Sequence, residues 1–482
     1  MKRIKYVPFL FVAVCTVIYL SLVFNNNLWL DEAFSASIIR CGFMEMVSRT
    51  FADTLPPFYN FAAWGFTRIF GFSTISLKLF SVLPMMILML VAALFIPKAA
   101  SERAACIYIV LITAMPHFLE HGVEIRMYSW AVLFASSAAI FALCVIKEIR
   151  HADIWLVAST VLGAYTHQYA LIAESLIWIA LLVISIRKKM MKRWIIAAGI
   201  CVAAYIPCAI LTVFQMKAAV SYFSAEPVSF GSMMASVRYP FVTDVTVLSA
   251  LLLVGTMILL YLSVINILVN VNECRRHEFR LTAYTAEQIF KPAIKFDREY
   301  KSFMCSYLIV IYILEILLSF GIMVFTGSTF FTSRYLMPAL GMLWLGAALV
   351  LDEALLKKRI LWAFVIPLVG LALVTGYIKN YKAEYVDTSE FEAFIDSTGS
   401  DDGYLIIEDY PEIEICLEYY APWLKKYETE QLDEIPGNKY LLVNGDVHTD
   451  DIEKIKSKGY EIYYKENYCF DRYTFKAYVL NR

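Results

Sequence analysis

Two adjacent carboxylates, Asp31 and Glu32, follow a long apolar run at the point where the chain would leave a membrane. Two arginines, Arg126 and Arg334, stand just ahead of later apolar runs. A positioned carboxylate can accept a proton from a hydroxyl, and arginine presents a planar fork that matches phosphate oxygens. These residue types suit transfer of a sugar from a lipid phosphate to a hydroxyl, although an anion transporter could use the same residues.

Polar segments that contain ionisable residues recur along the chain, each close to the end of an apolar run. They read DTLPPFYN (53–60), EHGVEIRMYSW (120–130), THQYALIAES (166–175) and TSRYLMP (332–338). Ionisable groups at membrane depth are costly and usually face a cavity, so these segments supply candidate site residues. The residues singled out are Asp53, Arg126, Tyr128, His167, Arg334 and Tyr335.

Each of these residues also has an ordinary structural explanation. Arginines near a membrane surface can snorkel, tyrosines can belong to an aromatic belt, and His167 could be a hydrogen-bonded loop residue. The opening of several such segments on one face of the membrane favours a shared site over coincidence.

The composition indicates a membrane environment. Of the 482 residues, 60% are hydrophobic and 18% are charged, and the mean hydropathy is +0.61. Soluble proteins carry about a quarter charged residues, so we expect a polytopic membrane protein. The net charge of −1 points to no nucleic-acid partner.

No metal or cofactor site is predicted from the motifs. The ten cysteines fall singly, without CxxC or zinc spacing. His121 and Glu124 are three residues apart in HGVEIR, but the pattern lacks the third ligand that zinc would need. Walker A, GxGxxG, HExxH and GxSxG motifs are absent, so no cofactor is expected, and the metal requirement stays open.

About eleven apolar runs are candidates for membrane-spanning helices, which satisfy every backbone polar group within the segment. Lysine and arginine concentrate in the loops on the same side as the N-terminus, which places that terminus in the cytoplasm and the acidic pair outside. Two helices are expected to lie on the membrane surface within the outer loop 25–75. The runs cover residues 6–24, 77–97, 104–119, 127–146, 153–166, 169–186, 194–214, 246–270, 302–325, 336–351 and 360–378.

The composition becomes polar and charged near residue 380. Segments 404–408, 439–444, 460–464 and 473–480 read as strands, with helical stretches near 411–421 and 448–458 between them. We therefore expect an all-α polytopic membrane domain over 1–379 and a small extracytoplasmic α/β domain over 380–482. Cys416 and Cys469 both fall in the second domain and could pair.

The order of these motifs resembles that of the GT-C-type multi-spanning glycosyltransferases, the group that includes the bacterial lipid A aminoarabinose transferase and the protein O-mannosyltransferases. WLDEAFSA is similar to their exit-helix Asp/Glu motif, and DTLPPFYN to their segment with two prolines. EIRMYSW, THQY and SRYLMP are similar to their later R-x-Y, T-H-Y/F and R-Y-L-x-P segments. The resemblance covers about 1–350, the membrane part.

The resemblance implies a role for each matched residue. Asp31 would be the base that activates the acceptor hydroxyl, Glu32 would orient the acceptor or the base, and Asp53 would line the same cavity. Inversion at the sugar carbon and independence from nucleotide sugars would follow. The residues implied in holding or bordering the polyprenyl phosphate are Arg126, Tyr128, His167, Arg334 and Tyr335.

Two positions depart from the family pattern. Leu55 stands where the family has a histidine before the two prolines, which removes any phosphate contact of that side chain. Lys78 replaces a family arginine near the start of the second span, which keeps the charge but loses the planar fork. Leu55 is the best argument for an inactive lipid-binding relative.

The sequence is therefore interpreted as an inverting, GT-C-like membrane glycosyltransferase, with its catalytic domain over 1–379. Its expected partners are a polyprenyl-phosphate sugar donor, membrane lipids, and a lipid, wall-polymer or protein acceptor. The expected location is the bacterial plasma membrane, with the N-terminus cytoplasmic and the C-terminal domain outside. The alternatives are a polyprenyl-lipid or anion transporter and an inactive relative.

Overall fold

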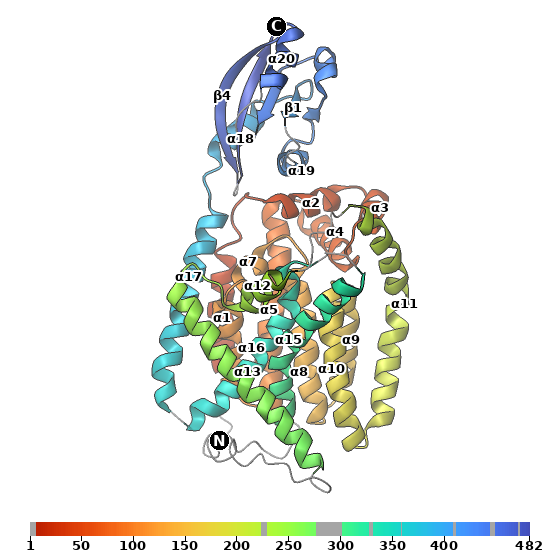
Figure 1. The fold of residues 1–482 in the computed structure, drawn as a ribbon, viewed down its shortest axis with the longest axis vertical. Helices are drawn as coiled ribbons and strands as arrows, with labels where there is room; N and C mark the ends of the chain where they lie inside the picture. Colours follow the sequence, from red (N-terminus) through yellow and green to blue (C-terminus); the bar gives the residue numbers. More distant parts are fainter. Residues whose placement is uncertain are drawn as a thin grey trace.

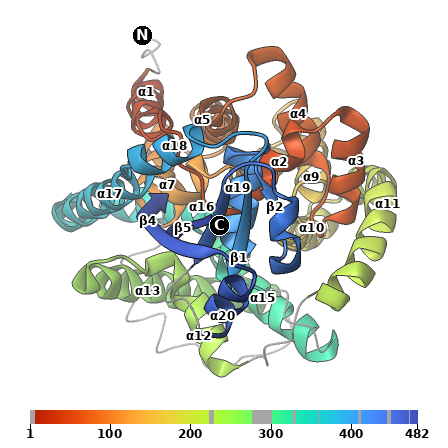
Figure 2. The same ribbon diagram turned by 90° about the horizontal axis from the view of Figure 1, so that it is seen from above.

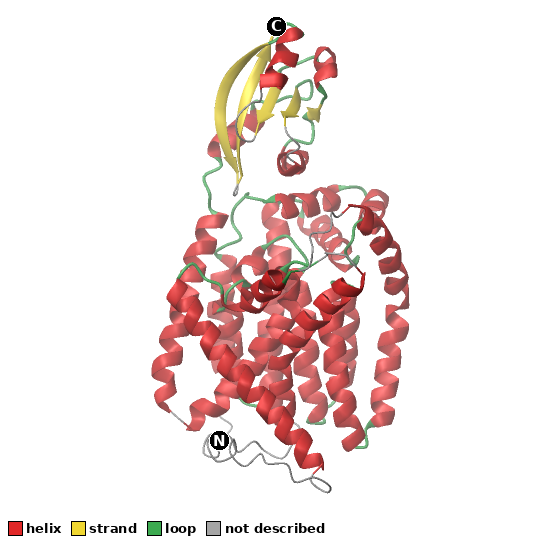
Figure 3. Cartoon of the chain, viewed as in Figure 1, coloured by secondary structure: helices red, strands yellow, loops and turns green. Residues whose placement is uncertain are grey.

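Long apolar helices form the body of the molecule, and a small sheet stands at one end (Figures 1 and 3). The computed structural model describes residues 6–222, 229–275, 301–326, 331–357, 359–407, 411–443, 449–470 and 473–482. The described part of the N-terminus lies at the end of the bundle opposite the sheet (Figure 1). The prediction of a mostly helical polytopic protein with a small C-terminal sheet is confirmed.

Each of the predicted spans coincides with a helix. By length and hydropathy, 8 helices of the described chain can cross a membrane. Helices α1 (Val7–Leu20), α6 (Glu102–Ala114) and α9 (Ala152–Ala164) are shorter. The long helices are α5 (Thr74–Ala99), α8 (Tyr128–Ile146), α10 (Gln168–Arg187), α11 (Met191–Tyr222), α13 (Thr246–Arg275), α15 (Lys301–Thr326), α16 (Met337–Lys357) and α17 (Trp362–Glu384).

Helix α8 lies at the centre of the bundle and is buried along its whole length. Helix α16 is nearly as buried, whereas α11, α13 and α17 expose most of their apolar side chains. Viewed from above, α11 and α17 lie at the periphery, where they can face lipid (Figure 2). The segment that enters α8 is therefore held by the core, and it carries two of the candidate site residues, Arg126 and Tyr128.

Short helices cap the bundle at the end that carries the sheet. The first surface helix predicted in 25–75 is broken in two, α2 (Leu30–Arg40) and α3 (Phe43–Ala52), because Cys41 and Gly42 are extended (ψ 161° and 157°). The second begins after Pro57 as expected and is α4 (Phe58–Phe70). The other short elements are α7 (Phe118–Val123), α12 (Phe230–Arg238), η1 (Tyr239–Phe241), η2 (Ser333–Leu336) and η3 (Arg359–Leu361).

The C-terminal sheet has the strand order β2-β1-β3-β5-β4, with β1 parallel to β2 and β3, and β5 antiparallel to β3 and β4. Only the two-residue strand β2 lacks a counterpart among the predicted strands. Cys416 and Cys469 do not form a disulfide with each other, so the pairing considered for them is wrong. The elements are α18 (Ser389–Asp396), β1 (Gly403–Ile407), α19 (Pro411–Tyr420), β2 (Lys425–Lys426), η4 (Thr429–Glu434), β3 (Lys439–Val443), α20 (Thr449–Ser457), β4 (Glu461–Phe470) and β5 (Tyr473–Asn481).

Helix α19 joins this region to the bundle by packing on α2 (Figure 1). The Tyr420 hydroxyl donates to the Asn26 carbonyl (2.8 Å) and accepts from the Leu28 N–H (2.9 Å). The neighbouring Tyr419 ring lies under the Arg40 guanidinium, 4.8 Å from its carbon. The sheet is therefore attached to the loop that leads into Asp31.

Close contact between α15 and α16 depends on Gly346. A Cβ there would lie 2.9 Å from the Cys305 carbonyl oxygen and 2.7 Å from Ile309 Cγ1. We expect Gly346→Ala to lower stability by about 1–3 kcal/mol, because the two helices must separate. Thermal unfolding in detergent measures this. Gly321→Ala, with no atom within 4 Å of the added Cβ, is the control, and equal midpoints for both variants would contradict close packing at Gly346.

Candidate active site

The start of α2 is held by the carboxylate of Glu32. Its Oε2 accepts the N–H of Trp29 (3.1 Å), the residue that caps the helix, and its Oε1 accepts the N–H of Ile125 (2.8 Å). The side chain is buried, and burial raises its pKa to about 8 in spite of nearby Lys78. Both oxygens of Glu32 thus accept hydrogen bonds from backbone N–H groups.

Asp31, the neighbour of Glu32, pairs with Arg334. Its Oδ2 lies 2.8 Å from a terminal nitrogen of the Arg334 guanidinium, and both side chains keep some exposure. The guanidinium also stacks over the Trp29 ring, 5.2 Å from its centre. Among the described residues, Asp31 Oδ2 has no hydrogen bond of good geometry. Asp31 is therefore held by its ion pair with Arg334, and this oxygen can still accept a hydrogen bond from a ligand.

Arg126 is fixed by neutral partners. One terminal nitrogen donates to the Ser35 hydroxyl (2.9 Å), and the same nitrogen is 3.5 Å from the Asp31 carbonyl oxygen. Its Nε is buried and has no hydrogen-bond partner among the residues described. A guanidinium held in this way keeps its charge available for an anion.

Four buried donors around this point lack hydrogen-bond partners in the part of the chain described: Arg126 Nε, Arg334 Nε, Tyr128 OH and His167 Nε2. The His167 ring lies 6.0 Å from the Tyr128 ring and 5.2 Å from the Tyr335 ring, centre to centre. Unsatisfied buried polar groups are costly and call for a ligand or water. The elements that bring them together are the segment before α8, the start of α8, the start of α10 and η2.

The protonation state of His167 is set by its surroundings. Its Nδ1 accepts the N–H of Tyr169 (3.1 Å), so Nε2 carries the proton of the neutral ring. Burial, with the charges of Arg126 and Arg334, lowers its pKa to about 3. His167 is therefore a neutral donor near two cations, which suits an anionic ligand.

The carboxyl group of Asp53 lies close enough to Arg126 to interact with its charge. Asp53 Oδ1 accepts the N–H of Thr54 (2.6 Å), and burial raises the pKa of this carboxyl, offset by the charge of Arg126. Gln215 donates to the Leu55 carbonyl (3.0 Å), so the backbone at the position of the missing family histidine is held from α11. The Leu55 side chain packs against the hydrophobic core.

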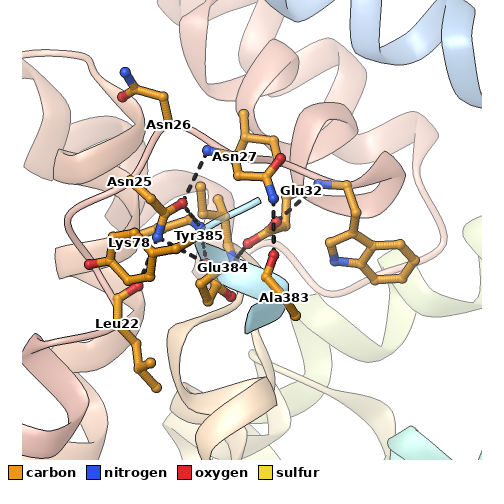
Figure 4. A network of polar contacts seen from close by, with 12 residues as sticks. Leu22, Asn25, Asn26, Asn27, Glu32, Lys78, Ala383, Glu384 and Tyr385 are labelled. Atoms are coloured by element: carbon orange, nitrogen blue, oxygen red, sulfur yellow. Dashed lines mark hydrogen bonds and ion pairs between the residues drawn. The ribbon is translucent and has the colours of Figure 1, made fainter. Parts of the chain in front are cut away.

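Lys78, the counterpart of a family arginine, binds Asn25 and Glu384. It is completely buried, donates to Asn25 Oδ1 (2.6 Å) and forms an ion pair with Glu384 at the end of α17 (Figure 4). Asn25 donates to the same carboxylate (3.1 Å). This network ties α5, the end of α17 and the loop before α2 into one unit.

A cavity of about 730 Å³ opens beside these residues. Of the predicted site residues, Glu32 and Arg334 line it, together with Trp29. Its remaining wall comes from α7, the loops at η1 and η2, and the end of α17. The cavity gives a molecule access to the Arg334 side of the site.

Several residues of the site were not identified from the sequence. Ser35 binds Arg126, and Glu124 binds His121 (2.5 Å) on the cavity wall. Tyr239, in a loop where no site residue was predicted, binds His121 through its hydroxyl (2.8 Å). Glu124 could have been identified from the sequence, because it stands two residues before the candidate Arg126. No local sequence pattern indicates Tyr239.

Together, the fold and site define a polytopic helical membrane protein with a buried cationic pocket beside a carboxylate. No protein-family model matches the chain, and no curated protein matches it. Two solved structures with similar folds are those of ArnT from Cupriavidus metallidurans, in the apo state and bound to undecaprenyl phosphate. Each has a TM-score of 0.59, covers 97% of both chains, and is 13% and 12% identical, respectively.

The fold is therefore that of ArnT, and at this level the resemblance to GT-C-type transferases is confirmed. The likeness extends beyond the membrane part covered by the motifs, because it includes nearly the whole chain. A weaker likeness, with a TM-score of 0.49 and 12% identity, is to the oligosaccharyltransferase AglB from Archaeoglobus fulgidus, and it covers 98% of this chain and 74% of that one.

The Lys78–Glu384 pair provides a test of the network. Lys78→Met leaves the Glu384 carboxylate without its main partner, and removing one member of a buried pair costs about 3–5 kcal/mol. We expect a lower thermal unfolding midpoint in detergent and recovery in the Lys78→Met/Glu384→Met double variant. A double variant as unstable as the single one would show that Lys78 stabilises the protein by another contact.

Proposed function

We propose that this protein is a GT-C-type membrane glycosyltransferase that transfers a sugar from a polyprenyl-phosphate carrier to an acceptor hydroxyl, with inversion at the sugar carbon. The observation that best supports this proposal is the group of four donors next to Asp31 that have no hydrogen-bond partner among the described residues. A phosphate oxygen accepts from such donors, and a carboxylate beside them can take a proton. The ArnT fold, in a structure that contains undecaprenyl phosphate, supports this assignment.

The donor phosphate is assigned to the pocket between Arg126 and Arg334. Two guanidinium groups and the neutral His167 N–H would surround the phosphate oxygens, and Tyr128 and Tyr335 would add hydroxyl or ring contacts. The leaving phosphate gains negative charge as the sugar departs, so fixed donors lower the barrier by stabilising that charge. No histidine at position 55 is needed for this arrangement.

Asp31 is assigned as the base. The acceptor oxygen attacks the sugar carbon, the carbon–oxygen bond to phosphate breaks, and the hydroxyl proton moves to Asp31. The electron pair of the broken bond stays on the polyprenyl phosphate. Because Arg334 pairs with Asp31 in the unliganded structure, a bound phosphate would share Arg334 and free an Asp31 oxygen to accept the proton.

The proposed topology places this site on the outer face of a bacterial plasma membrane. The N-terminus would be cytoplasmic and the region after residue 379 would be extracytoplasmic, in keeping with the distribution of lysine and arginine. The acceptor would be a lipid, a wall polymer or a protein that reaches the site through the cavity lined by Trp29 and Arg334.

Asp31→Asn tests the base. We expect transfer from a panel of synthetic polyprenyl-phosphate sugars to fall by about 10²–10⁴-fold, while donor binding persists, because the amide cannot accept the proton. Purified protein in lipid vesicles is assayed for sugar transfer and, separately, for donor binding. Unchanged turnover in the variant would remove Asp31 from the mechanism.

Arg126→Gln tests the phosphate pocket. Loss of one charge-assisted contact of about 1.5–3 kcal/mol predicts roughly 10- to 100-fold weaker binding of polyprenyl phosphate, measured by titration in detergent. Arg68→Gln is the control, because Arg68 is exposed and, among the described residues, it donates to the backbone carbonyls of Arg40 and Cys41 and lies over the Trp64 ring. Lipid binding by the wild type without transfer of any sugar would favour the transporter or the inactive relative instead.

A further inference from the structure

A cluster of possible metal ligands lines the cavity of about 730 Å³ described above. His117, Glu120 and His121 each offer a ligand atom, and these atoms lie within 4.8 Å of one another. All three residues line the cavity. Of these three residues only His121 belongs to the HGVEIR pattern; His117 and Glu120 precede it, and Glu124 is not a member of the cluster.

In both histidines, His117 and His121, one ring nitrogen is used in a hydrogen bond to a neighbouring oxygen. The other ring nitrogen keeps its lone pair and can bind a metal ion. His117 Nε2 donates to the Tyr239 carbonyl (2.9 Å), and so Nδ1 is left with its lone pair. His121 Nδ1 lies 2.5 Å from Glu124 Oε2, and so Nε2 is left with its lone pair. Histidines that bind metals commonly donate their other N–H to a carbonyl or carboxylate in this way.

The separation between His117 and Glu120 also suits a shared ion. His117 Nδ1 and Glu120 Oε2 are 3.4 Å apart, which is long for a hydrogen bond. Two ligand atoms at zinc-binding distance from one tetrahedral ion lie about 3.4 Å apart. The third ligand, His121 Nε2, accepts from the Tyr239 hydroxyl at 2.8 Å, and an ion would displace this contact.

The chemistry of the cluster suits a transition-metal cation. Close to the cluster the cavity wall carries the carboxyl groups of Glu120 and Glu124. Imidazole and carboxylate together are the ligands of zinc and similar transition metals.

We propose that His117, Glu120 and His121 bind one divalent transition-metal ion of the zinc class. Glu124 and the Tyr239 carbonyl orient the two imidazoles from behind. Three protein ligands leave a fourth position open toward the cavity, where water or an oxygen of a bound molecule would coordinate. This site stands on its own contacts and does not depend on the transfer reaction proposed above.

Zinc binding is tested with the full chain, purified in detergent without a polyhistidine tag, stripped with chelator and equilibrated with Zn²⁺. We expect one tightly bound ion per chain by mass spectrometry, and at least a tenfold loss of affinity in His117→Asn and Glu120→Gln by competition with a chromophoric chelator. His151→Asn is the matched control, because His117 and His151 both precede a helix with positive φ (71° and 62°), which asparagine tolerates.

Two further measurements separate a metal site from a hydrogen-bond network. Tyr239→Phe removes the hydroxyl that occupies His121 Nε2 while keeping the carbonyl that orients His117, so zinc affinity should be unchanged or higher. X-ray absorption at the zinc edge should show two imidazole ligands. Zinc that binds equally to wild type and His117→Asn, or no stoichiometric zinc in the folded wild type, would overturn the proposal.

Discussion

The carboxylate of Glu32 is the contact on which the site depends. By accepting one N–H from Trp29 and one from Ile125, it joins two segments that are far apart in the sequence. One segment begins α2 and carries Asp31, and the other leads into the buried helix α8 and carries Arg126. Arg126 reaches the Ser35 hydroxyl and comes within 3.5 Å of the Asp31 carbonyl oxygen because the Glu32 side chain binds the backbone of Ile125, one residue away.

The second constraint is the cost of charge in a low-dielectric interior. Arg334 is paired with Asp31, and Lys78 is paired with Glu384, so these charges are balanced in the unliganded protein. Arg126 has only neutral hydrogen-bond partners among the described residues, and its charge is balanced at longer range by Asp31 and Asp53. A phosphate bound as we propose would place negative charge beside the unpartnered donors Arg126 Nε, Arg334 Nε, Tyr128 OH and His167 Nε2.

The sequence predicted the helices and much of the candidate site because both leave local patterns. Apolar runs placed the spans, and the segments WLDEAFSA, EIRMYSW, THQY and SRYLMP placed residues that the fold brings together. What it missed depends on distant contacts: His121 meets Tyr239 across 118 positions, and Lys78 meets Glu384 across 306. The break at Cys41–Gly42 was missed because the apolar spacing continues across it.

The C-terminal region is connected to the site and not merely appended to it. The loop 25–28 is held from one side by the end of α17, where Asn27 donates to the Ala383 carbonyl (3.1 Å), and from the other by Tyr420 of α19. Asp31 lies only three residues after the end of this loop. A molecule that moved α19 would therefore move the loop and change the relation of Asp31 to Arg334. Contacts of this kind give the C-terminal region a physical route to influence the carboxylate, whatever else it binds.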